Sequence, residues 1–236
     1  MNRLIESWES TFYTDVILYV VLFATLFVSI SRRKYFPQLR LFPLYLVFFI
    51  LLTTSSYIRT SLETTPYISI MPFRVIISQE YFVALLEYFV FSIFIMKILY
   101  TSHFKRIVQA SIAVTTIAFT LGYIFTFNVS SHAKYVMLHY LYLVESALLL
   151  LGVVFYYIEL FKFSPQSNLL KNPQFWVTSG LTFYLLCTLP ITIISPHLLG
   201  VDRGLYINMF SMIYTFYIIL FLMIIKGYLC RRTDLI

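Results

Sequence analysis

The feature that most constrains this chain is a series of long apolar runs separated by short polar connections. About 20 apolar residues in a helix span a hydrocarbon core of roughly 30 Å. Only a helix or a closed barrel satisfies its backbone polar groups there. The runs lie at residues 16–30, 41–58, 81–99, 107–127, 136–158, 175–194 and 205–229. They predict an all-α fold, a polytopic membrane helical bundle with seven transmembrane helices.

The composition supports a membrane rather than a water-soluble fold. Hydrophobic residues make up 60% of the chain and charged residues only 11%, whereas soluble domains carry about 25% charged residues. The connections are too short to hold a soluble domain, and the chain shows no internal repeat. We therefore expect residues 1–236 to form one seven-helix transmembrane domain, with the lipid bilayer as its main partner.

The distribution of basic residues predicts the orientation. If the N-terminus is outside, the cytoplasmic segments hold most of the 17 Lys and Arg residues, as the positive-inside rule requires. The first apolar run is followed by the basic cluster at residues 32–34 and preceded by an acidic tail. This pattern predicts an outer N-terminus and a cytoplasmic C-terminus in a multi-pass protein. The net charge of +7 comes from membrane flanks, so we expect no nucleic-acid partner.

Two carboxylates inside apolar runs are the first candidates for function. Glu87 lies in the run at 81–99 and Glu145 in the run at 136–158. With a rise of 1.5 Å per residue, both lie roughly 10–14 Å below the outer edge of the membrane. Intramembrane ionisable residues are costly and mark functional sites by default. The alternative is that each is protonated and hydrogen-bonded for structural reasons.

Further polar residues share the outer half of the predicted bundle, whereas the inner half is mostly aliphatic and aromatic. This asymmetry predicts a polar cavity that opens to the outside. The candidate ligand-binding residues are Glu87, Glu145, His139, Thr53, Thr54 and Asn208. Two structural alternatives stand beside this: Thr side chains often bond their own helix backbone, and the position of His139 near the interface is typical of a hydrated histidine.

A sevenfold spacing within the run at 136–158 and just beyond it predicts which face of that helix is buried. Leu138, Glu145, Gly152 and Glu159 recur every seven residues and so share one face. Gly152 would allow another helix to approach closely. We infer that this face points into the bundle.

No catalytic or cofactor motif is present. The sequence contains no HExxH, GxSxG, P-loop or clustered Cys/His pattern, so hydrolase, NTPase and zinc chemistry lack their residues. We predict no catalytic residues, no metal and no cofactor, and we favour a non-enzymatic role.

Three features carry a family resemblance: the segment Leu-Arg-Leu-Phe-Pro-Leu-Tyr-Leu at 39–46, the segment Lys-Asn-Pro-Gln-Phe-Trp-Val-Thr-Ser-Gly-Leu-Thr-Phe-Tyr at 171–184, and the intramembrane Glu in the third and fifth runs. Together they resemble uncharacterised seven-helix inner-membrane proteins of Bacteroidetes-type bacteria, which are similar to membrane sensor regions of two-component systems. The resemblance implies a cell inner-membrane location and a sensory role, and it supplies no catalytic residues. Few residues follow Lys226, so we expect no kinase output domain.

These observations favour an integral membrane sensor or ligand-binding protein. A small molecule or lipid would enter the outer cavity, where Glu87 and Glu145 would hold a cationic or hydrogen-bond-donating group. The basic connections would contact a cytoplasmic or membrane protein partner. Two alternatives remain: a structural or assembly subunit of the membrane, and a proton-coupled transporter that uses the same two carboxylates.

Overall fold

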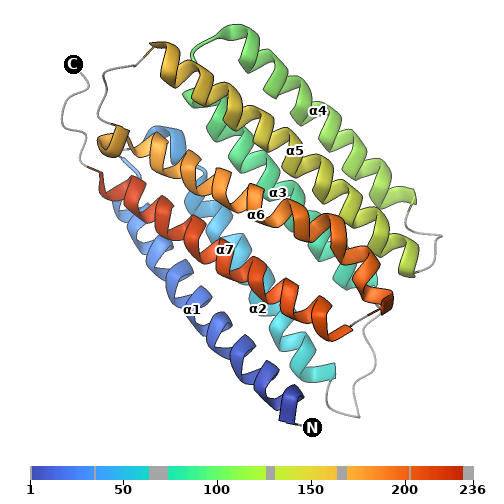
Figure 1. Ribbon diagram of the computed structural model, residues 1–236. Helices are drawn as coiled ribbons and strands as arrows, with labels where there is room; N and C mark the ends of the chain where they lie inside the picture. Colours follow the sequence, from blue (N-terminus) through green and yellow to red (C-terminus); the bar gives the residue numbers. More distant parts are fainter. Residues whose placement is uncertain are drawn as a thin grey trace.

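The computed structural model describes residues 2–34, 36–63, 74–125, 131–163, 169–201 and 203–230. Within these residues all regular secondary structure is helical. The α-helices are α1 (Asn2–Arg32), α2 (Phe42–Glu63), α3 (Arg74–Ile98), α4 (Ser102–Phe125), α5 (Ser131–Phe163), α6 (Pro173–Val201) and α7 (Arg203–Leu229), and the short 3₁₀ helices are η1 (Pro37–Leu39) and η3 (Leu169–Lys171). Figure 1 shows the seven long helices side by side, running between the same two ends of a bundle. The predicted all-α fold is confirmed.

Six of the described helices are long and apolar enough to cross a membrane. The spans are Tyr13–Arg32, Pro37–Ser55, Ser102–Gly122, Met137–Phe163, Pro173–Ser195 and Met212–Leu229. The sequence predicts a seventh in α3, whose described residues include Glu87 and Lys97 and are not among these spans. The molecule is therefore a multi-pass, membrane-like helical bundle with six spans of sufficient length and apolarity.

Six helices form a ring, and α4 packs outside it. Each helix of the ring contacts the next in the order α1, α2, α3, α5, α6, α7, and α7 closes the ring against α1. Helix α4 contacts α3 and α5 and is the least buried of the six spans. Figure 1 shows α4 at one side of the bundle. Because successive long helices alternate in direction, the same end of the bundle holds the end of α1 and the starts of α2, α4 and α6. We call it the basic end, since Arg40, Lys105 and Lys171 lie there.

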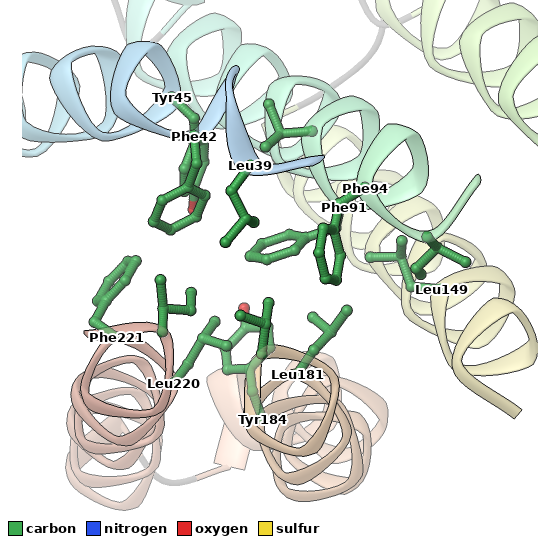
Figure 2. Close-up of a cluster of buried hydrophobic side chains, with 14 of the residues drawn as sticks. Leu39, Phe42, Tyr45, Phe91, Phe94, Leu149, Leu181, Tyr184, Leu220 and Phe221 are labelled. Atoms are coloured by element: carbon green, nitrogen blue, oxygen red, sulfur yellow. The ribbon is translucent and has the colours of Figure 1, made fainter. Parts of the chain in front are cut away.

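The centre of the ring is filled by aromatic and aliphatic side chains. Figure 2 shows Phe42 of α2, Phe91 of α3, Leu181 of α6 and Phe221 of α7 converging in this core, and each is almost fully buried. Other large apolar side chains point outward. Phe27, for example, is 73% exposed. Apolar cover on the outside of a helical bundle is what a lipid solvent requires.

A local signal explains where α6 begins. The side-chain oxygen of Asn172 accepts a hydrogen bond from the backbone N–H of Gln174 at 2.9 Å. Pro173 occupies the first helical position, where its missing N–H costs nothing. Asn172 is thus the N-terminal cap of α6.

Candidate functional site

Glu87 lies at the centre of the helical ring and is bound by tyrosines from neighbouring helices. Its side chain is 4% exposed. The hydroxyl of Tyr217, on α7, donates a 2.7 Å hydrogen bond to Glu87 Oε2. The hydroxyl of Tyr45, on α2, donates to the same oxygen over a longer 3.5 Å. Tyr184 of α6 also lies next to this carboxyl group, so side chains of α2, α6 and α7 meet at a residue of α3.

Ring contacts hold these tyrosines in place. The ring centroids of Tyr184 and Tyr217 are 4.5 Å apart, and Phe49 lies 5.3 Å from Tyr217. Tyr45 packs 5.7 Å from Phe49. Figure 2 shows Tyr45 and Tyr184 entering the same interior from opposite sides. Aromatic packing at these separations favours particular ring orientations. In these orientations the hydroxyl groups of Tyr45 and Tyr217 point toward Glu87.

Glu145 is the second carboxyl group of this interior. It lies on α5, is 4% exposed, and is close enough to Glu87 for the two groups to interact electrostatically. Its Oε2 atom is buried and has no hydrogen-bond partner among the described residues. The sequence left open whether these two residues face one another, and the structure brings them together. We call them the carboxyl pair.

Among the described residues, no fixed positive charge is buried beside the carboxyl pair. No Lys or Arg side chain of the described residues is buried. An unpaired ionised carboxylate in a dry interior costs several kcal/mol even after relaxation. A neutral polar group without a partner costs only about 1–3 kcal/mol. The pair therefore requires a proton or a positively charged group close to it.

His139 is also buried. It is 6% exposed and precedes Glu145 on α5. Its neighbours in sequence, Leu138 and Leu141, form a small apolar cluster with Ala84 and Phe119. The reading of His139 as a hydrated interfacial side chain is thus not what the structure shows.

The two predicted threonines have structural hydrogen bonds. Thr53 Oγ1 donates to the carbonyl oxygen of Phe49 at 2.8 Å, within its own helix. Thr54 Oγ1 accepts a 3.3 Å hydrogen bond from the hydroxyl of Tyr19, which joins α1 to α2. The Thr53 contact matches the structural alternative for threonine in membrane helices, whereas the Thr54 contact links two helices.

Asn208 lies away from the carboxyl pair. Its side chain is exposed on α7, whereas Tyr217 on the same helix reaches Glu87. The sequence grouped Asn208 with the site by depth alone. Residues 208 and 217 differ by nine positions, which is two and a half helical turns, so they face opposite sides of α7.

A small hollow lies at the basic end of the bundle. It measures about 10 Å³, roughly room for one water molecule. Its lining residues come from η1 and its flanks, α3 and α6: Phe36, Gln38, Leu39, Phe94, Pro173 and Gln174. The polar cavity predicted for the outer half stays a prediction, since its outer rim would include residues outside the described part of the chain.

Sequence reasoning missed the tyrosines and one carboxylate. Tyr45, Tyr184 and Tyr217 bind or adjoin Glu87, yet tyrosine also belongs at membrane interfaces, so its presence in an apolar run was not informative. Tyr184 and Tyr217 lie near the middle of their runs, far from either interface, and this was the available signal. Glu159, which is 2% exposed, accepts hydrogen bonds from the backbone N–H groups of Tyr100 and Thr101 at 2.6 and 2.7 Å. It fixes the start of α4 and is a structural residue.

The six membrane-length spans define the class of this chain, a multi-pass helical membrane protein. Within the described residues, no group of three or more His, Cys, Asp or Glu side chains could hold a metal ion. Comparison of the chain with protein families, curated proteins and solved structures finds no match. Its function is therefore argued from the carboxyl pair alone.

Proposed function

We propose that this chain is a seven-span sensor or ligand-binding protein of a bacterial inner membrane, with its N-terminus outside. Its carboxyl pair receives a cationic or hydrogen-bond-donating group of a small molecule or lipid. The observation that carries this proposal is the buried, unpartnered Oε2 of Glu145 beside Glu87. A purely structural carboxylate would be expected to have its hydrogen bonds satisfied, as those of Glu159 are.

The seventh span in this proposal is α3. This helix contacts α2, α4 and α5 and has the same length class as the other six. Glu87 and Lys97 lower its apolarity, but Glu87 is covered by protein rather than lipid. Polar residues are tolerated in membrane helices where they face the bundle interior. Seven spans also agree with the alternation of basic connections.

The packing on the basic side of the carboxyl pair favours binding over transport. Phe42, Phe91, Leu181 and Phe221 are almost fully buried there, and Figure 2 shows them filling the interior. A transporter requires a polar path or broken helices that reach both membrane surfaces. A sensor requires only that occupancy of the site change helix packing, and Glu87 contacts residues of α2 and α7 directly.

Thermal unfolding with a simple ammonium ion tests this proposal. The full chain in nanodiscs of neutral lipid is titrated with n-butylammonium. We expect saturable stabilisation, because a ligand that binds only the folded state adds about 2.7 kcal/mol at 100 times its dissociation constant. The Glu145→Gln variant should lose this stabilisation. Glu159→Gln is the matched control, since it makes the same change on the same face of α5 and should retain it.

Two results would contradict the proposal. One is the lack of any ammonium-dependent shift in the wild-type protein. The other is a shift of equal size in wild-type and Glu145→Gln proteins, which would place the bound cation elsewhere, for instance at the anionic end of a lipid. The Glu159→Gln control separates loss of the binding site from general loss of stability.

A further inference from the structure

The two members of the carboxyl pair have unequal surroundings. Glu87 Oε2 accepts hydrogen bonds from Tyr217 and Tyr45, with Tyr184 adjacent. Glu145 Oε2 accepts none from the described residues. An ionised carboxylate is a pure acceptor and is stabilised by O–H donors. The hydroxyl groups therefore favour a negative charge on Glu87 and provide no such support at Glu145 Oε2.

The surrounding side chains are packed closely. The rings of Tyr184 and Tyr217 lie 4.5 Å apart between centroids, and Leu149, one turn beyond Glu145, is 2% exposed. A proton is the one positive species that needs no volume of its own. Two neighbouring buried carboxyl groups cannot both be ionised without a compensating positive charge, because like charges at short range each disfavour the other's ionisation.

We infer that the carboxyl pair is a proton-binding site in which Glu145 carries the proton and Glu87 is the ionised partner held by tyrosine hydroxyls. This inference rests on the proposed function. It identifies a proton as the positive charge at the carboxyl pair when no ligand is bound. Proton uptake converts the Glu145 carboxylate to a carboxylic acid, and the reverse step returns the proton to the medium. A cationic ligand that binds the pair displaces this proton, so one positive charge replaces another.

Among the described residues, the other titratable groups near the pair come from several helices. Helix α2 supplies Tyr45, α6 supplies Tyr184 and α7 supplies Tyr217. On α5 itself, Tyr142 lies close to Tyr184, and His139 is the nearest buried base along the chain. An imidazolium at His139 is therefore the competing source of positive charge, and the experiment includes it.

Infrared spectroscopy of the full chain in nanodiscs tests the assignment without any ligand. A protonated carboxyl group gives a carbonyl band separate from the amide bands, and ¹³C-labelled glutamate shifts the band if a glutamic acid produces it. At neutral pH the wild-type protein should show this band from a buried glutamic acid. Glu145→Gln should remove it, and Glu159→Gln and His139→Gln should leave it in place. Glu145→Asp should keep a band that no longer responds to labelled glutamate.

Three outcomes overturn the assignment. The first is a wild-type spectrum without the band. The second is a band that persists in Glu145→Gln. The third is a band that appears only in His139→Gln, which would identify the imidazolium as the positive charge. If Glu145→Gln does not fold, Glu145→Asp and the isotope shift decide the question. Because the band is recorded without n-butylammonium, a band with no ammonium stabilisation refutes the ligand proposal alone.

Discussion

At the scale of single residues, three buried carboxylates differ by what surrounds them. Glu87 accepts tyrosine hydroxyls, Glu145 has an unpartnered oxygen, and Glu159 accepts two backbone N–H groups. The N–H groups of Tyr100 and Thr101 stand at the start of α4, where a helix leaves its first donors unsatisfied. Glu159 thus fastens the α3–α4 connection to α5.

Removal of this contact should destabilise the fold. Glu159→Ala should lower the free energy of unfolding by about 2 kcal/mol, because two backbone N–H donors lose their side-chain acceptor. Glu159→Gln keeps one carbonyl oxygen and should lose roughly half as much. Reversible unfolding in mixed micelles measures both. Lys162→Ala, at an exposed position on the same helix, is the control, and equal stability of Glu159→Ala and this control would refute the structural role.

The sequence identified residues by depth but not by direction. Glu87 and Glu145 stood out because a carboxylate in an apolar run has few explanations. Asn208 had the same predicted depth and is exposed, because a helix places residues at one depth on any side of its axis. The sequence placed Glu159 on the buried face but did not reveal its acceptor role, because that role depends on the backbone N–H groups of Tyr100 and Thr101. Only the packed structure supplies these rotations and long-range contacts.

At the scale of helices, the sevenfold spacing on α5 predicted the buried face correctly. Leu138, Glu145, Gly152 and Glu159 are all buried. A Cβ atom on Gly152 would lie 3.3 Å from side-chain atoms of Ile95 on α3, so the glycine does permit a close approach. The spacing was informative because residues seven positions apart share one face of a helix, and three of these four are polar or small.

A second glycine contact gives a sharper prediction. A Cβ atom on Gly180 would lie 2.7 Å from the Cβ of Met223, an atom that cannot move without the backbone of α7. Gly180→Ala should therefore separate α6 from α7 and cost about 1–3 kcal/mol of unfolding free energy. Gly152→Ala meets the branch and tip of Ile95, which can adjust, and should cost less. Unfolding in mixed micelles compares the two variants, and the reverse order would contradict the prediction.

The sequence predicted a helix end well only where the apolar run and the helix end at the same residue. The run at 205–229 ends where α7 ends, at Leu229. The run at 16–30 falls short of α1, which begins at Asn2, and α3 begins at Arg74, before the run at 81–99. Hydropathy reports the length in hydrocarbon, whereas hydrogen bonding continues a helix beyond the membrane into its polar flanks.

At the scale of the whole molecule, the ring with α4 outside it could not be predicted from the runs. Short connections predict that successive helices are antiparallel neighbours. They do not predict that α3 contacts α5 as well as α4. That choice depends on which faces are buried, and α4 has the least buried span. The number of spans likewise depends on which faces are buried. Helix α3 contacts α2, α4 and α5, and its described residues are not among the six spans.

The number of spans determines on which sides of the membrane the two termini lie. An odd number places them on opposite sides, and an even number places them on the same side. With a Cys187→Ser background, the native Cys230 reports on the end of α7 and Asn2→Cys reports on the start of α1. We expect a membrane-impermeant maleimide to label Asn2→Cys on intact cells, and to label Cys230 only after permeabilisation.

The labelling of Cys230 should also depend on pH. Burial raises the pKa of the Cys230 thiol, and nearby Lys226 opposes this change only in part. Because the thiolate is the reactive form, labelling in permeabilised cells should be slow at neutral pH and accelerate as the pH rises. Cys187 lies within the Pro173–Ser195 span, so a Cys230→Ser protein is the control and should label under neither condition.

Labelling of both termini on intact cells would mean an even number of spans and would exclude α3 as a membrane helix. Glu87 would then lie on a helix that does not cross the membrane and is held only by contacts with the other helices. A ligand would have to reach the carboxyl pair by a path other than the one proposed for a seven-span bundle.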